Sequence, residues 1–559
     1  MKGVVRLHSK EFAWILAASG LAYALAVLFA SALEHIEQSV WTPLTQQPMG
    51  TYLGLSFLLI TLGAAGGGWL MRSVDAGAAG SGIPQLKLAY WRDFALVPLR
   101  AVVVKFFAGL LCIGGGMSLG KEGPTVFMAG GAASVLATRL GLTAKHRRLL
   151  CACGASAGLA AAFNTPLAAV AFVLEEMLEN LNSRLMGRLV LASFTAVFLL
   201  HWFRGSGALL ELPQDVTSNW RSVLLSAPVA VLAGLAGAYF QKASLALRRR
   251  LRRFQEKSAF VPVLGAWITW CAGVAVFALT GRGGVFGLGF TDLNAALAGA
   301  LPLGALALLL GGKWVATVTS YGSGGSGGIF APSLFMGAMC GGLVGGLLQS
   351  SGWLGADGNE SLAVVGMGAF LVAVVRAPAT SLLIVFELTH DFDIIPPLMI
   401  GTLCALRVAK FVCKENFYNQ VLADDGHDLA RYRPAESFSD WKQRAVTWQA
   451  NFSPCCLPVG DLGMARQIVE SNPWRIYPAI EADGTVVGAV LRDDIAHAGD
   501  RLPVRSCAIV PAQSTLHDAQ KAMLGTDLDF VVIVDTERRA LAILTLHDLL
   551  RAQLSAMEE

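Results

Sequence analysis

The sequence context of Glu122 indicates a chemical role more strongly than that of any other residue in this chain. It lies in the sequence GKEGP at residues 120–124, within a long apolar part of the chain. An ionisable side chain inside a membrane is costly and usually functional. Glycine lets backbone amides approach an ion closely, and proline is common in the first turn of a helix. We therefore expect a helix N-terminus that attracts an anion here, with Glu122 imitating that anion when ionised and leaving when protonated.

A second motif repeats this pattern further along the chain. The sequence GIFAP occupies residues 328–332, and its Pro332 follows Pro124 by 208 residues. Irregular backbone at membrane depth is tolerated where it is buried in protein or lines a cavity, and matched interruptions in two halves point to a transport site. We expect the backbone amides of Ile329 and Phe330 to be anion donors.

Two hydroxyl groups are further candidate donors. Ser81 belongs to the sequence GSGIP at residues 80–84, and Tyr418 follows the last apolar stretch. Taken alone, Ser81 resembles a turn or cap residue, and Tyr418 resembles an anchor at the membrane surface. Beside the two motifs above, their hydroxyls can donate hydrogen bonds to an anion. We predict that Ser81, Gly82 and Tyr418 bind the same anion.

The elements that must position these residues come in two related sets. Pro166 is followed nine residues later by Glu175, and Pro378 is followed at the same distance by Glu387. The two prolines are 212 residues apart, close to the 208 residues that separate the motifs. This predicts an internal repeat, which we expect to be inverted. Because Glu175 has a counterpart in Glu387, we interpret both as structural helix-end carboxylates.

Composition separates a membrane part from a water-soluble part. Hydrophobic residues make up 54% of the 559 residues, which excludes an ordinary soluble protein and a disordered one. Lys and Arg outnumber Asp and Glu by 30 to 19 before residue 421 and are outnumbered 13 to 20 after residue 420, where charges are twice as dense. We predict an all-α polytopic membrane domain over 1–420 with halves of about 1–205 and 220–420, a linker over 421–445, and a small α/β domain over 446–559.

Basic residues gather at 2–10 and 248–253, each time beside an apolar stretch. The positive-inside rule places both clusters in the cytoplasm. A nucleic-acid partner would explain a basic balance, but it would need one continuous basic surface rather than two short clusters. We therefore expect a multi-pass protein of the lipid bilayer with a cytoplasmic N-terminus and tail, and no nucleic-acid partner. The ten cysteines lack the spacing of a zinc site, so we expect no metal.

These motifs together resemble the CLC family of chloride channels and chloride/proton antiporters. The resemblance rests on GSGIP, GKEGP, GIFAP, the sequence EEM at residues 175–177 and Tyr418, and it covers about residues 10–420. It implies the CLC fold, a homodimer with one pore in each subunit, and residence in a cell (inner) membrane. It further implies chloride as substrate, no required cofactor, and Glu122 as the external gating and proton-transfer glutamate. In this family, Ser at the Ser81 position goes with chloride preference.

Glu176 distinguishes two mechanisms within the family. The resemblance implies that antiporters carry a second, internal proton glutamate at this position, whereas channels usually lack it. Glu176 has Leu388 as its counterpart in the repeat, so its charge is specific to one half. This favours a chloride/proton antiporter over a passive chloride channel. A more distant alternative is an intramembrane hydrolase using Glu122 and Glu176, but no nucleophile and base motif accompanies them, so we do not expect an enzyme.

The tail resembles a pair of CBS modules. Strand-like stretches at 485–491, 529–534 and 540–545 alternate with helical segments. Such pairs often bind adenine nucleotides through a Ser or Thr followed three residues later by Asp, and Thr545 and Asp548 fit this pattern. In the first module Asp494 follows Leu491, which lacks the hydroxyl. The resemblance therefore implies a possible nucleotide site, with a packing or dimerisation module as the alternative.

Overall fold

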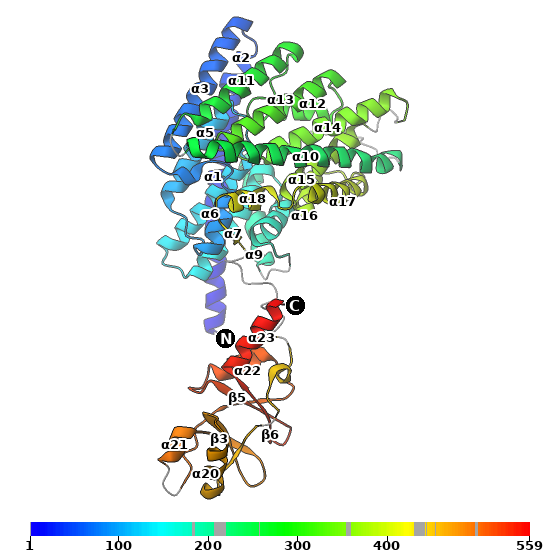
Figure 1. Cartoon of the computed structure of the whole chain (residues 1–559). Helices are drawn as coiled ribbons and strands as arrows, with labels where there is room; N and C mark the ends of the chain where they lie inside the picture. The colour runs from blue at the N-terminus through cyan, green and yellow to red at the C-terminus, as the bar shows by residue number, and fades with distance from the viewer. Residues whose placement is uncertain are drawn as a thin grey trace. The chain divides into compact units, whose positions relative to one another are not determined.

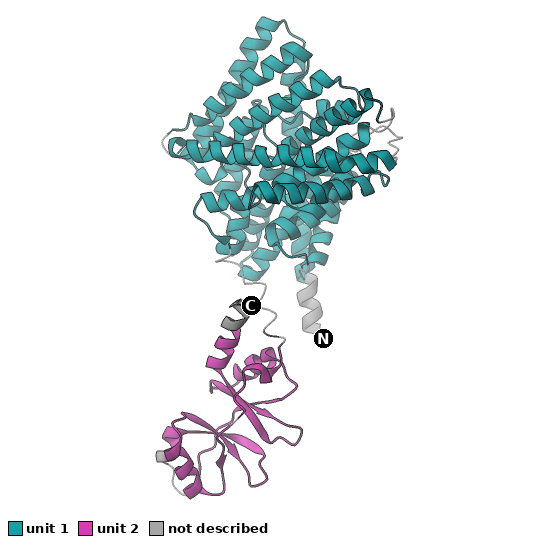
Figure 2. Ribbon diagram, turned by 45° about the vertical axis from the view of Figure 1, so that its right-hand side comes forward, with its two compact units in different colours: residues 1–429 teal, residues 430–559 magenta. Residues whose placement is uncertain are grey.

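The computed structural model describes residues 2–181, 185–205, 220–255, 258–353, 359–429, 442, 444–452, 454–497 and 501–558. The chain forms two compact units, Met1–Leu429 and Ala430–Glu559 (Figure 2). The division falls nine residues after the change in composition at residue 420. The reason is that α18 (Phe417–Asp424) buries Phe417, Tyr418, Val421 and Leu422 among the helices of the first unit.

In the described part of the first unit, the regular elements are all helices (Figure 1). Its first half contains α1 (Lys2–Ile36), the π-helix η1 (Glu37–Trp41), α2 (Thr42–Leu44), α3 (Met49–Ser73), the 3-10 helix η2 (Ala76–Ala78), α4 (Ile83–Arg92), α5 (Leu99–Gly114), α6 (Glu122–Arg139), α7 (Ala144–Phe163), α8 (Pro166–Phe172), the π-helix η3 (Val173–Leu178) and α9 (Met186–Arg204). Its second half contains α10 (Trp220–Gln255), α11 (Val261–Thr280), α12 (Phe290–Leu297), α13 (Leu303–Gly322), α14 (Phe330–Ser350), α15 (Asn359–Val375), α16 (Pro378–Thr389), α17 (Ile395–Val412) and α18.

Helix lengths divide these elements into spanning and broken helices. Eight helical stretches in the described residues are long and apolar enough to cross a membrane. A bilayer core takes about 20 helical residues, so α8 with 7 residues and α12 with 8 cannot cross it. The helices α6 and α14 begin at Glu122 and Phe330, directly after glycine-rich loops. The prediction of helices that start within the membrane domain at both motifs is confirmed.

Small residues let the central helices approach closely. A Cβ atom at Gly154 of α7 would lie 2.6 Å from the Cβ of Ala133 of α6. In the other half, a Cβ at Gly337 of α14 would lie 2.7 Å from the Cα of Met367 of α15. Because lipid tails are as apolar as leucine, helices in a membrane associate through such close packing rather than through the hydrophobic effect.

A reciprocal pair of carboxylates relates the two halves. Glu175, at the end of the α8–η3 segment, accepts hydrogen bonds from two amides in the first turn of α16 at 3.0 and 2.8 Å. Glu387, near the end of α16, accepts from two amides in the first turn of α8 at 2.9 and 2.7 Å. The two helices therefore run antiparallel, as an inverted repeat requires. The interpretation of Glu175 and Glu387 as structural carboxylates is confirmed, since each stabilises a helix N-terminus of the other half.

The second unit contains two copies of one α/β module. The strands β1 (Leu457–Pro458), β2 (Ile476–Ile480) and β3 (Val486–Leu491) form one sheet, and β4 (Ala508–Pro511), β5 (Phe530–Val534) and β6 (Ala540–Thr545) form the other. In each sheet the first pair is parallel and the second antiparallel. The remaining elements are η6 (Val446–Gln449), α20 (Leu462–Ser471), α21 (Arg492–Ala496), α22 (Leu516–Met523) and α23 (Leu546–Glu558). The three predicted strands are confirmed to within one residue at each end as β3, β5 and β6.

Candidate functional site

Three glycine-rich loops meet and are joined through their backbones. The amide of Gly120 donates to the carbonyl of Gly328 at 2.7 Å, and the amide of Gly328 donates back to Gly120 at 2.7 Å. The amide of Gly80 donates to Gly325 at 3.1 Å, and the carbonyl of Gly80 accepts from Gly327 at 3.0 Å. Backbone hydrogen bonds thus join loops that are more than 200 residues apart in the sequence, and α4, α6 and α14 begin directly after these loops.

Gly82 has a conformation that favours glycine. It is the N-cap of α4 with φ 91°, a left-handed value that L side chains rarely adopt. A Cβ at this position would also lie 2.7 Å from the Cβ of Phe127. The sequence prediction places Gly82 at the anion, and the structure places it at the start of a helix, where free amide groups attract anions.

The hydroxyls of Ser81 and Tyr418 are the most telling atoms of the site. Both residues are completely buried, and neither hydroxyl has a hydrogen-bond partner in the described part of the chain. The Ser81 hydroxyl is the hydrogen-bonding neighbour of the Tyr418 phenol, at a geometry outside an ordinary hydrogen bond, so the two hydroxyls lie close together although their residues are 337 positions apart. A buried donor left unpaired costs about 1–3 kcal/mol, so two of them at one place indicate a site built for an acceptor.

The carboxylate of Glu122, the first residue of α6, lies at the N-terminus of α14. Its Oε2 accepts a hydrogen bond from the Ala331 amide at 3.3 Å, and its Oε1 has no partner among the described residues. The carboxylate therefore occupies the place where the α14 amides would hold an anion. The neighbouring Lys121 reaches Glu34, at 4.0 Å, and forms no ion pair with Glu122 among the described residues.

Ile329 and Phe330 are the N-cap and the first residue of α14. Amides at these positions have no carbonyl partner within their own helix, as expected for anion donors. The ring of Phe330 packs on Phe163 and Phe172, with ring centroids 5.6 and 6.1 Å apart. This packing holds the start of α14 against α7 and α8.

Glu176 belongs to the π-helix η3, where it is 1% exposed. Its Oε1 lies 2.6 Å from the ammonium group of Lys87, and its Oε2 accepts from the amide side chain of Asn416 at 2.9 Å. Lys87 also contacts Glu179 at 2.6 Å. π-helical turns are rare in proteins overall, but those that occur are often found at functional sites. The neighbours Glu175 and Glu176 face different partners, the first turn of α16 and Lys87.

Sequence reasoning missed four polar residues that support the site. Lys87 and Asn416 hold Glu176, and Asn416 is also the N-cap of α18, two residues before Tyr418. Lys105 is completely buried and donates to the carbonyls of Ala78 and Gly80 at 2.9 and 2.5 Å.

Lys313 does the same in the other half, donating to the carbonyls of Gly284 and Gly287 at 2.9 and 2.8 Å. Lys105 and Lys313 are 208 residues apart, the offset of the two motifs. That matching offset was the signal that could have found them.

Comparison with known proteins places this architecture in a family. The profile of the voltage-gated chloride channel family matches residues 63–410. The chain belongs to this CLC family. It is 32% identical over 422 residues to the H(+)/Cl(-) exchange transporter ClcA of Cronobacter sakazakii, which covers 72% of this chain and 86% of that protein. It is 31% identical over 376 residues to ClcA of Yersinia pestis bv. Antiqua, covering 66% of this chain and 77% of that protein.

Solved CLC structures share the fold. A slow cyanobacterial Cl−/H+ antiporter superposes with a TM-score of 0.66 at 27% identity, covering 75% of this chain and 98% of that one. A eukaryotic CLC transporter superposes with a TM-score of 0.62 at 19% identity and covers 97% of this chain and 98% of that one. The protein is thus a multi-pass membrane protein of a chloride-transporting family and not an enzyme.

The tail residues singled out for nucleotide binding are engaged with other groups of the tail. A CBS domain profile matches residues 498–555, the second of the two modules. There the Thr545 hydroxyl donates to the Asp548 carboxylate at 2.6 Å, and the Asp548 amide donates back to Thr545 at 3.2 Å, which caps α23. In the first module, Arg505 donates two hydrogen bonds to Asp494 at 2.8 and 2.9 Å. Across the described residues, no three His, Cys, Asp or Glu side chains gather as metal ligands would.

Proposed function

We propose that this CLC-family protein exchanges chloride for protons, with Glu122 as a gate shared by both ions and Glu176 as the internal proton acceptor. The proposal rests on one observation: buried hydrogen-bond donors lie near a carboxylate of the protein itself, which can occupy the place of an anion. Ser81 and Tyr418 offer buried hydroxyls without partners, and the Glu122 carboxylate lies on the next set of donors at α14. The name of the bacterial relatives, H(+)/Cl(-) exchange transporter, supports exchange rather than passive conduction.

The gate works through competition for one helix N-terminus. Ionised Glu122 accepts the Ala331 amide and so excludes chloride from that place. Protonation removes the charge and with it the attraction of the helix dipole and amides, which is worth up to about 2 kcal/mol in partly buried geometries. The neutral side chain leaves, and chloride takes the donors of α14, including Ile329 and Phe330. When chloride departs, the acid releases its proton and returns.

The proton acceptor is linked to the chloride site through α18. Asn416 caps this helix and donates to Glu176, and Tyr418 stands in the first turn of the same helix. Protonating Glu176 requires its carboxylate to give up the ion pair with Lys87. Both events change the hydrogen bonds at the start of the helix that carries Tyr418, which is a physical route between the proton and the anion.

The test is reconstitution of the purified chain in liposomes with a chloride gradient and a record of external pH. Exchange predicts that chloride moving down its gradient drives protons uphill. Chloride flux without proton movement would support the alternative, a passive chloride channel of the same family. A complete lack of chloride flux would contradict both.

The remaining family features belong to the same proposal. We expect a homodimer with one pore in each subunit, a chloride preference at Ser81, and a cell (inner) membrane location with the N-terminus and tail in the cytoplasm. Subunit counting by single-molecule photobleaching in liposomes tests the dimer, and a single bleaching step for each protein would contradict it.

Adenine nucleotide binding by the tail rests on Thr545 and Asp548, with Asp494 in the first module. Thr545 and Asp548 already bond each other, so a ribose would have to share Asp548 with the helix cap. Isothermal titration of the whole chain with ATP tests this site. Heat of binding that disappears in Asp548→Asn would support it, and the absence of heat in the unmodified chain would leave the packing role.

A further inference from the structure

A cavity of about 710 Å³ opens beside the Ser81 loop, and its lining includes residues of α4, α10 and the end of α18. Its lining includes Gly80, Tyr321, Arg248, Arg252 and Asp425. Gly80 directly precedes Ser81, and Tyr321 interacts with the backbone amide of Ser81. The cavity therefore reaches the residues next to the proposed anion site, although Ser81 itself is completely buried.

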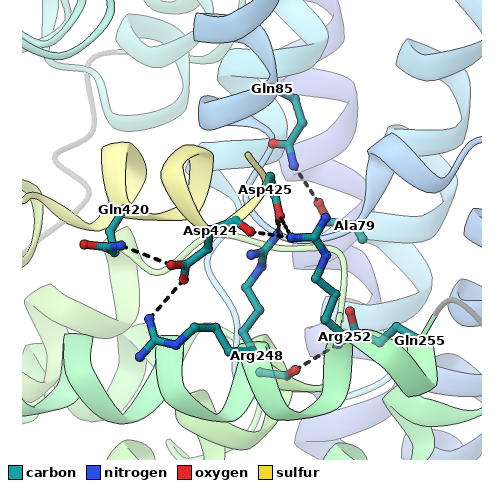
Figure 3. Close-up of polar contacts among 10 residues, drawn as sticks. Ala79, Gln85, Arg248, Arg252, Gln255, Gln420, Asp424 and Asp425 are labelled. Carbon is teal, nitrogen blue, oxygen red and sulfur yellow. Dashed lines mark hydrogen bonds and ion pairs between the residues drawn. The ribbon is translucent and has the colours of Figure 1, made fainter. Parts of the chain in front are cut away.

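Two arginines of α10 meet one carboxylate in this cavity (Figure 3). Nη2 of Arg248 donates to both oxygens of Asp425 at 2.8 Å, and Nη1 of Arg252 lies 2.9 Å from the same carboxylate. Two guanidinium charges thus face one carboxylate charge. Nη1 of Arg248 is buried and has no hydrogen-bond partner in the described residues. The cluster retains positive charge and a donor, which are what a small anion needs.

We propose that Arg248 and Arg252 form a second anion-binding site at the mouth of the path next to Ser81, and that Asp425 is a tethered competitor that weakens it. The ligand class is a small monovalent anion such as a halide. The inference rests on the proposed anion path past Ser81 and Tyr418. An anion at Nη1 of Arg248 would share the guanidinium charge with Asp425 and would be repelled by its carboxylate.

The position of Asp425 connects this site to the chloride site. Asp425 is the C-cap of α18, and Tyr418 lies in the first turn of the same helix. A helix of this length measures about 12 Å. The ion pairs to α10 therefore fix the helix that carries the Tyr418 hydroxyl. An anion that takes Arg248 from Asp425 would loosen that attachment as it enters.

The neighbouring ion pair supplies a matched control. Arg249, one residue after Arg248, lies 3.1 Å from Asp424, one residue before Asp425. Neither residue lines the cavity. The substitutions Asp425→Asn and Asp424→Asn thus each remove one carboxylate charge that faces an arginine of α10, but only Asp425→Asn frees donors inside the cavity.

The experiment uses the whole protein with bromide as the probe. Crystals of the Asp425→Asn variant grown in bromide should show an anomalous difference peak within hydrogen-bonding reach of Nη1 of Arg248. In liposomes, the chloride concentration at half-maximal flux should fall about fivefold, the effect of one unit charge about 4 Å away in a water-like medium. Asp424→Asn should lower that concentration much less, because the Asp424 carboxylate bonds Arg249 and acts on Arg248 only from further away, and Arg248→Gln should abolish the bromide peak.

Three results would overturn the inference. The first is the absence of a bromide peak at Arg248 in the Asp425→Asn crystals. The second is such a peak without any change in chloride flux, which means binding at crystal concentration only. The third is an equal change in the chloride concentration at half-maximal flux for Asp424→Asn. If Arg248→Gln does not fold, the comparison of the two Asp variants still decides. A bromide peak at Arg248 in a protein that moves chloride but no protons would refute the exchange proposal and leave this site standing.

Discussion

Replacing Lys87 by Met is expected to stop proton transport while leaving chloride transport in place. Lys87 is completely buried, and its ammonium group lies 2.6 Å from a Glu176 carboxylate that is 1% exposed. Removing one partner of a buried ion pair leaves an uncompensated charge and costs about 3–5 kcal/mol. A carboxyl group in this position escapes most of that cost by keeping a proton. Glu176 would then no longer release protons in each cycle, although Ser81 and Tyr418 would still bind chloride.

The assay combines transport with stability. In liposomes, chloride flux and uphill proton movement are recorded for Lys87→Met, Glu176→Gln and the double variant. Thermal unfolding of the same proteins in detergent measures the loss of the ion pair. Because replacing both partners of a buried pair is often nearly neutral, the double variant should regain most of the stability that Lys87→Met loses.

Glu179→Gln is the matched control for this prediction. Glu179 lies equally close to Lys87, at 2.6 Å, but its side chain is 27% exposed. Pairs with an exposed partner are worth about 0–1 kcal/mol, so this variant should keep both its stability and its proton transport. The reasoning is refuted if Lys87→Met pumps protons as the unmodified protein does, or if Glu179→Gln loses proton transport to the same extent.

Further outcomes follow from the same geometry. Glu122→Gln should retain chloride flux and lose proton movement, since a neutral amide cannot carry a proton, and persistent proton pumping would contradict the assigned gate. Ser81→Ala and Tyr418→Phe should each raise the chloride concentration at half-maximal flux roughly 2- to 12-fold, the worth of one hydrogen bond of about 0.5–1.5 kcal/mol, and flux curves at several chloride concentrations measure this. In the tail, hydrogen bonds from the amide and hydroxyl of Thr515 hold the pKa of Asp518 below its ordinary value of 3.8. This capping interaction stabilises α22 above pH 3.8 and is lost as pH falls through the folded-state pKa. Thr515→Ala should therefore speed amide exchange of α22 more at neutral pH than in strong acid, where it removes only the hydrogen bond from the Asp518 amide to the Thr515 hydroxyl.

The internal repeat could be predicted from the sequence because its matching residues lie at a nearly constant offset along the chain. Proline, glycine and glutamate at matched offsets predicted a repeat of interrupted helices, and in the structure the pairs α6 and α14, and α8 and α16, begin at the matched positions. The distinction between Glu175 and Glu176 was also available, since Glu387 repeats the first and Leu388 replaces the second. Local patterns of this kind survive because backbone preferences of Gly and Pro act within a few residues.

The sequence by itself determined the membrane domain, the family motifs and the glutamates that carry the proposal, because each depends on residue type and short-range spacing. Only the tertiary structure determined which charged side chains form ion pairs with each other. Lys87 reaches Glu176 across 89 residues, and Asp425 reaches Arg248 across 177. Such pairs have no local signal, since an ion pair depends on the distance between two charges in space. The packing of α4, α10 and α18 brought these charges together, so that residues far apart in the sequence form one site.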